Sequence, residues 1–114
     1  DRSAALPASL LELRDVTINA DPRFVTIRGQ VHNLSTSANL LDMTLRLSAL
    51  DCPAEVEPIA ECIVIGADDA VARVAVPAGQ LRAFEATFLI RNLPRPDGVL
   101  RWHYLITDTR AQPQ

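Results

Sequence analysis

The sequence VTIRGQVHN at residues 25–33 alternates between apolar and polar side chains along its whole length. Its apolar or small positions are Val25, Ile27, Gly29 and Val31, and its polar positions are Thr26, Arg28, Gln30 and His32. A period of two places the first set on one face of a β-strand and the second set on the other. The stretch therefore predicts a half-buried antiparallel strand, with one face against a core and one face in solvent.

The same alternation recurs on both sides of this stretch. Three further runs have apolar side chains at every second position: Met43, Leu45, Leu47 and Ala49; Phe84, Ala86, Phe88 and Ile90; and Leu100, Trp102, Tyr104 and Ile106. Shorter or less regular apolar runs lie at residues 11–18, 62–65 and 71–76, and residues with turn chemistry separate the runs at 21–22, 35–37, 67–69, 76–79 and 96–98. About seven strands at these spacings predict an all-β, immunoglobulin-like sandwich of two antiparallel sheets. Residues 6–13 are the one segment that could form a helix instead, with Pro7 in the first turn of that helix.

Length and composition bound the domain organisation and the class of protein. The 114 residues fit one domain, and a hydrophobic fraction of 48% with 22% charged residues excludes a disordered tail. We expect a single sandwich domain at residues 10–110, a linker or N-terminal tail at 1–9 and a frayed C-terminal tail at 111–114. The net charge of −3 argues against a nucleic-acid-binding protein, which needs a basic surface. No apolar run approaches the length of about 18 residues that a membrane-spanning helix needs.

Two cysteines, Cys52 and Cys62, flank a nine-residue segment that contains Pro53 and Pro58. Strands that end before this segment and resume after it would bring the two thiols together at the base of a hairpin. A disulfide there would stabilise the fold by about 3 kcal/mol in the chain-entropy model, and it predicts an oxidising compartment. The alternatives are two free buried thiols in a cytosolic protein, or half of a metal site. Zinc needs four ligands, and the sequence has no second cysteine pair.

The two histidines, His32 and His103, each lie on the polar side of a predicted strand. If those strands are neighbours, the two imidazoles could form a weak metal site or a pH-sensitive contact on one exposed face. This arrangement defines an alternative function, a ligand- or metal-binding sensor domain. In the other interpretation both histidines are solvated side chains and the protein holds no metal.

Catalytic patterns are missing from the sequence. None of its serines lies in a G-x-S-x-G elbow, and its four glycines do not form a phosphate-binding loop. All eleven basic residues are arginine, so chemistry that needs a lysine amine is excluded. Aromatic residues make up 4% of the chain, too few for a platform that stacks sugars. We therefore expect a protein that is not an enzyme and carries no cofactor.

Charge is distributed unevenly along the chain. The interval between Arg46 and Arg73 holds six carboxylates and no basic residue, whereas six arginines and three carboxylates follow from Arg73 onward. A surface with two poles of charge can steer and select a protein partner, whereas the alternative is ordinary solvated loop charges. The residues expected to contact a partner are Glu55, Glu57 and Glu61 on the acidic side, and Arg82, Arg91, Arg95 and Arg101 on the basic side.

Asn33, at the end of the stretch that opened this section, belongs to the tripeptide Asn33-Leu34-Ser35, which fits the pattern for N-glycosylation. An asparagine at the end of a strand also hydrogen-bonds readily to the backbone of the adjacent turn. We expect the second, structural role.

The order of these residues resembles that of FxLYD-type domains, a family of small bacterial immunoglobulin-like sandwiches. Residues 29–33, GQVHN, are similar to the family's G-x-V-x-N strand, and Asp51 matches the last position of its F-x-L-Y-D signature. At the other signature positions Leu47, Ala49 and Leu50 stand as apolar replacements. Pro77 and Gly79, followed by Phe84, resemble the family's P-G turn and strand. The resemblance covers residues 17–88 and implies a non-catalytic domain outside the cytoplasmic membrane, tethered by a preceding helix.

Together these features predict a non-catalytic interaction or assembly module in the periplasm. Its partner would be another envelope or membrane protein, to which it is an accessory. Because the sequence starts at Asp1 rather than at methionine, we expect a targeting or anchoring segment before it that tethers the domain to the inner membrane. Free strand edges would accept a strand of the partner, and the charged residues would select it.

Overall fold

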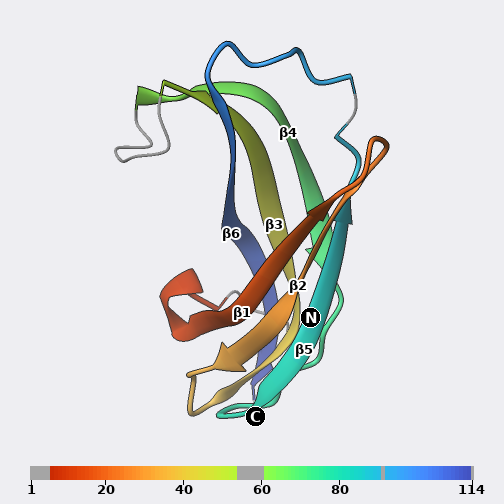
Figure 1. Cartoon of the computed structure of the whole chain (residues 1–114). Coiled ribbons are helices and arrows are strands. Elements are labelled where there is room, and N and C mark those ends of the chain that lie inside the picture. Colours follow the sequence, from red (N-terminus) through yellow and green to blue (C-terminus); the bar gives the residue numbers. More distant parts are fainter. Residues whose placement is uncertain (1–5, 54–60, 91, 114) are drawn as a thin grey trace.

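The computed structural model describes residues 6–53, 61–90 and 92–113. Within these residues the chain forms one short 3-10 helix and six strands (Figure 1). In chain order they are η1 (Ala8–Leu10), β1 (Leu11–Ala20), β2 (Val25–Asn33), β3 (Ala38–Cys52), β4 (Ile63–Ala72), β5 (Leu81–Phe88) and β6 (Val99–Pro113). The strands build two antiparallel sheets of the orders β1-β2-β5 and β4-β3-β6. The predicted all-β, two-sheet sandwich is confirmed.

The core lies between the two sheets, where the alternation of the sequence predicts it. Val25, Ile27 and Val31 of β2 are buried, as are Met43, Leu45 and Leu47 of β3 and Phe84, Ala86 and Phe88 of β5. Trp102 and Tyr104 of β6 are half-buried and pack against this cluster, so their faces are assigned correctly although they are not its most buried members. Leu100, expected on the same face, is exposed by 41%.

The number of strands differs from the prediction because the apolar runs at 62–65 and 71–76 share one strand. Residues 67–69, predicted as a turn, lie in the middle of β4. Their two carboxylates are accommodated in a strand because each has a partner far away in sequence: Asp69 binds Arg46, and Asp68 accepts a hydrogen bond from the backbone N–H of Leu89. Val76, beyond the end of β4, forms only an isolated bridge with Leu40.

Both predicted tails are wrong where the structure describes them. Leu6 is buried, and its N–H and C=O are both hydrogen-bonded to the hydroxyl of Thr109 in β6, at 2.6 and 2.7 Å. The predicted helical alternative at residues 6–13 shrinks to the single turn η1. At the other end, residues 111–113 continue β6 by pairing with the start of β3, and Ala111 is buried. The sandwich therefore extends beyond residues 10–110 on both sides.

Asn33 has the predicted structural role at the end of β2. Its side chain is fully buried, and its amide nitrogen donates to the carbonyl oxygens of Ala38 and Val76, each at 2.9 Å. Its amide oxygen accepts from the N–H of Ser35 at 2.9 Å. One side chain thus joins β2 to the start of β3 and to the turn before β5.

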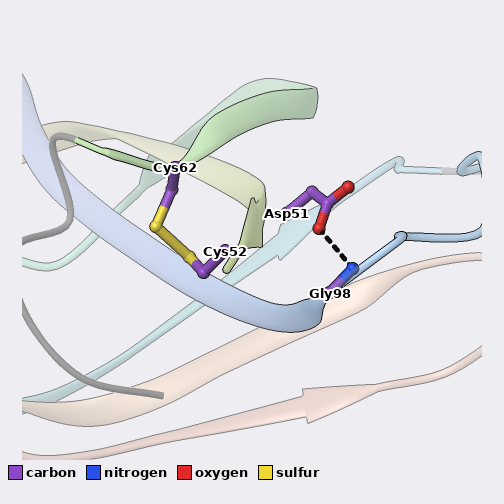
Figure 2. Close-up of a disulfide and its surroundings, with 4 residues drawn as sticks. All are labelled: Asp51, Cys52, Cys62 and Gly98. Carbon is purple, nitrogen blue, oxygen red and sulfur yellow. Dashed lines mark hydrogen bonds between the residues drawn. A yellow bond between two sulfur atoms is a disulfide. The ribbon is translucent and has the colours of Figure 1, made fainter. Parts of the chain in front are cut away.

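The disulfide between Cys52 and Cys62 is confirmed (Figure 2). It links the last residue of β3 to the residue before β4, at the base of the predicted hairpin. Beside it the carboxylate of Asp51 accepts hydrogen bonds from the N–H groups of Asp97 and Gly98, at 3.0 and 2.9 Å. Covalent and polar links therefore tie the start of β4 and the start of β6 to the same end of β3.

Candidate functional site

Four strands lie at the margins of the two sheets, and three of them are interrupted. β1 shifts register against β2 between Arg14 and Thr17, where Asp15 has a positive φ of 52°. β4 carries an extra residue, Ile65, opposite the step from Ala49 to Leu50, and β6 carries an extra residue, Thr107. Such bulges twist a sheet margin and protect it against pairing with other chains.

The fourth margin, β5, is regular. It pairs with β2 from Val25–Phe88 to His32–Leu81 without any shift of register, and its sequence contains no proline (Figure 1). The side chains of Ala83, Glu85 and Thr87 on its outer face are exposed. Among the described strands, β5 is thus the one sheet margin that has neither a bulge nor a proline.

The structure separates the arginines predicted to form a basic contact surface. Arg82 lies in β5 opposite Val31, near the end of the sandwich that Asn33 closes. Arg101 pairs with Leu50 near the disulfide, and Arg95 precedes β6 in the connection at that same end. Arg91 lies outside the described residues. Of the three predicted contact arginines that the structure describes, Arg82 therefore lies at the opposite end of the sandwich from Arg95 and Arg101.

Of the three glutamates predicted to contact a partner, the structure describes Glu61. Glu61 is exposed beside Cys62 and lines a shallow hollow with Asp51 and Asp97, so it shares an end with Arg95 and Arg101. Glu55 and Glu57 lie outside the described residues. Of the predicted contact residues that the structure describes, Glu61, Arg95 and Arg101 therefore share one end of the sandwich.

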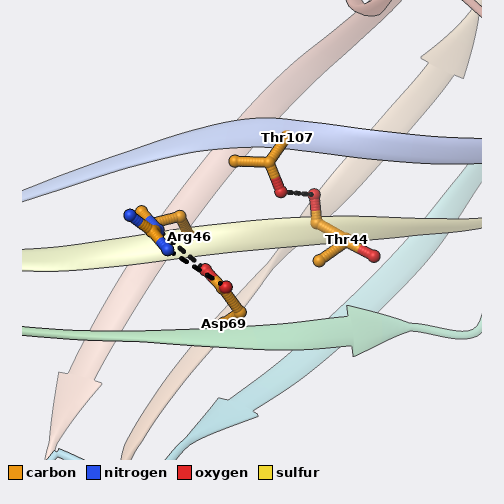
Figure 3. Close-up of polar contacts among 4 residues, drawn as sticks. All are labelled: Thr44, Arg46, Asp69 and Thr107. Atoms are coloured by element: carbon orange, nitrogen blue, oxygen red, sulfur yellow. Dashed lines mark hydrogen bonds and ion pairs between the residues drawn. The ribbon is translucent and has the colours of Figure 1, made fainter.

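Among the described residues, three ion pairs join charged side chains of neighbouring strands. Arg46 of β3 donates to both carboxylate oxygens of Asp69 in β4, at 2.9 and 3.2 Å (Figure 3). The pairs Arg28–Glu85 and Arg110–Asp42 join β2 to β5 and β6 to β3. The hydrogen bonds from Arg46 lower the pKa of Asp69 below its ordinary value of 3.8, and the same contact raises the pKa of Arg46.

The pKa of Asp69 leads to a test of this pair. A carboxyl group with a lower pKa in the folded state contributes stability above its unfolded pKa, and this contribution disappears as the pH falls through the folded pKa. Asp69→Asn should therefore lower the melting temperature at neutral pH, and the two proteins should converge below pH 3.8. Thermal unfolding of both proteins across this pH range, with Ser48→Ala as a control that does not titrate, measures the difference. A gap between the two melting temperatures that is the same at neutral and acidic pH would contradict the assignment.

The two histidines do not form a shared site. His32 belongs to β2 and His103 to β6, in different sheets, so their polar faces lie on opposite sides of the sandwich. The Nδ1 atom of His32 lies 3.2 Å from a guanidinium nitrogen of Arg14. Because a guanidinium only donates hydrogen bonds, Nδ1 is the acceptor in this contact. Within the described part of the chain no group of three or more metal-ligating side chains exists.

One surface hollow is lined mainly by polar and charged side chains. This hollow of about 510 Å³ on the outer face of the β4-β3-β6 sheet is lined by Asp42, Arg73, Asp108 and Arg110. Asp42 and Arg110 are paired with each other there, and the pair raises the pKa of Arg110. Nothing in this set resembles a nucleophile with an adjacent base.

Comparison with known proteins assigns no family, because no family model and no curated protein matches the sequence. In the residues that the structure describes, no helix has the length and apolar character needed to cross a membrane.

The feature that sequence reasoning missed is the position of β5 at a sheet margin. The alternation of residues 84–90 predicts the strand, but the order of strands depends on pairings between distant segments. Ala83 and Thr87 carry no chemical signal of their own. The absence of proline and the uniform alternation of β5 were the only local hints.

Proposed function

We propose that this protein is a non-catalytic interaction or assembly module of the cell envelope, an accessory to another envelope or membrane protein. The observation that supports the proposal is the contrast between β5 and the other three sheet margins. Bulges and prolines are two of the devices by which natural proteins keep a sheet margin from pairing with other chains, and β5 has neither. A regular margin retained beside three bulged ones is what a domain needs to accept a strand from a partner.

The proposed compartment is the periplasm, with a tether to the inner membrane. The disulfide supports an oxidising compartment, because thiol pairs in the cytosol are kept reduced. The FxLYD resemblance supports the same place, and the buried Asn33 performs the turn-closing role that its strand motif implies. No cofactor, nucleic acid or enzymatic activity is part of the proposal.

Site-specific photo-crosslinking in native membranes tests this function. The sequence contains no lysine, so amine-reactive reagents would miss its side chains. We would place a photoreactive residue at Thr87 in β5 and, in a second protein, at Leu105 on the outer face of the other sheet. The proposal predicts a single dominant adduct from position 87 and none of that mass from position 105. No adduct above background from either position would refute the interaction function.

A further inference from the structure

The alternation of hydrogen bonds between β5 and β2 shows which backbone groups of β5 face away from β2. The N–H of Asn33 donates to the carbonyl of Gln80 at 2.9 Å, just before β5 begins. In an antiparallel ladder the residues that bond to the neighbouring strand alternate with those that point away from it. The backbone N–H and C=O groups that bond to β2 are therefore those of Arg82, Phe84, Ala86 and Phe88. The backbone groups that point outward are those of Leu81, Ala83, Glu85 and Thr87.

Two other contacts agree with this assignment of bonded and outward-pointing residues. The N–H of Leu89, the next outward position, donates to the carboxylate of Asp68 in β4 at 2.8 Å. On the opposite side of β2, the N–H of Leu34 donates to Leu10 at 2.8 Å, as the alternation requires. Asp68 satisfies the donor just past the end of β5, and the guanidinium of Arg82 satisfies the outward carbonyl of Leu81. The outward backbone groups that remain open are therefore those of Ala83, Glu85 and Thr87 and the N–H of Leu81.

Arg82 decides which strand can occupy this stretch. It has the same parity as Phe84 and Ala86, so it lies on the core side of the sheet, yet its side chain is exposed. The guanidinium donates to two neutral oxygens, the amide of Gln80 at 3.4 Å and the carbonyl of Leu81 at 2.9 Å. It thus differs from Arg28, Arg46 and Arg110, which bind carboxylates.

The position of Arg82 in the ladder brings it close to an incoming side chain. Because its own N–H and C=O bond to β2, it would form a non-hydrogen-bonded pair with a strand added outside β5. Side chains approach each other most closely in such pairs, at a Cα separation of about 4.5 Å. A cation on the core side of a margin deters an apolar strand and accepts a strand with a carboxylate at that position.

We infer that β5 binds an extended segment of a partner protein that carries Asp or Glu opposite Arg82. The inference rests on the proposed interaction function and specifies its partner. The segment pairs with the outward backbone groups of residues 81–87 that are still open, and its carboxylate forms the ion pair that Arg82 lacks among the carboxylates of the described chain. A second copy of this chain fits less well, because in a symmetric β5–β5 pair residue parity keeps Arg82 and Glu85 on opposite faces.

The test uses the full-length protein in native membranes with the photoreactive residue at position 87. Ala83→Pro removes one outward N–H and leaves the ladder to β2 intact, so we expect the adduct to fall about tenfold. Ala83→Thr keeps the N–H and is expected to retain the adduct. Arg82→Glu, which changes no backbone group, should lower it about tenfold, whereas Arg82→Lys retains most of it. Thermal unfolding of each variant shows whether the fold is intact.

Mass spectrometry of the cross-linked peptide identifies the chemistry of the partner. The inference predicts a segment with Asp or Glu within two or three residues of the cross-link. A basic or uncharged segment, an adduct of twice this chain's mass, or an adduct unaffected by both Ala83→Pro and Arg82→Glu would overturn it. In those cases a persistent adduct still supports an interaction module, whereas the absence of any adduct refutes the proposed function itself.

Discussion

Asn33→Ala should lower the free energy of unfolding by about 4 kcal/mol, a large share of the 5–15 kcal/mol typical of a domain. The substitution deletes three hydrogen bonds from a side chain that has no exposed surface. It also leaves the carbonyl of Ala38 and the N–H of Ser35 without this partner, whereas the carbonyl of Val76 keeps the hydrogen bond from the N–H of Leu40 at 2.9 Å. A buried polar group without a partner costs about 1–3 kcal/mol, so the two groups left without this partner raise the loss above that of an ordinary truncation.

Urea unfolding followed by the fluorescence of Trp102, the single tryptophan, measures this loss. The matched control is Asn39→Ala, since Asn39 is half-buried and its side chain accepts one hydrogen bond, from Ala78 at 3.0 Å. We expect the control to lose about 1 kcal/mol. Equal losses for the two variants would show that Asn33 does not hold the three segments together.

The second large effect concerns the close approach of two strands beside the disulfide. A Cβ added at Gly98 would lie 2.0 Å from the carbonyl oxygen of Cys52, inside any allowed contact (Figure 2). The added Cβ is fixed to the backbone of residue 98, and the Asp51 hydrogen bonds hold that backbone against the end of β3. The start of β6 must therefore move away from β3 and lose those bonds. We expect Gly98→Ala to cost 3 kcal/mol or more, at or above the upper end of the range for overpacking, about 1–3 kcal/mol.

Gly79→Ala is the control for this prediction. Gly79 has a φ of 77°, but an added Cβ would meet nothing within 4 Å. Its cost is therefore the conformational penalty alone, about 1 kcal/mol. Urea unfolding of both variants separates steric overlap from backbone conformation. Finding Gly98→Ala as stable as Gly79→Ala would mean that the two strands are not in close contact.

Local periodicity and turn chemistry predict much of this fold because they act within a few residues. The alternation at residues 25–33 identifies β2 and the face that it buries, and the cysteine spacing identifies the disulfide. Asn33 was predictable for the same reason, since an asparagine at a strand end bonds to the adjacent turn.

The wrong predictions concern residues whose hydrogen-bond partners are distant in sequence. Asp68 and Asp69 have the composition of a turn, and they become strand residues because Leu89 and Arg46 satisfy their carboxylates. The predicted tail at 111–113 is part of a strand because its backbone pairs with the start of β3. The candidate site at β5 was hidden for the same reason. Whether a strand is central or marginal depends on all the pairings in the sheet, and no local pattern records them.

The position of β3 in the middle of its sheet also has a consequence for the order in which the chain folds. One of its two neighbours, β6, follows every other described strand in the sequence. During synthesis from the N-terminus, one edge of β3 therefore has unpaired backbone groups until residues 99–113 have been synthesised. Pairings of such long range slow folding, and unpaired strands are prone to aggregate in the meantime. This sheet can therefore be completed only after residues 99–113 have been synthesised, so its folding ends after every described strand has been translated.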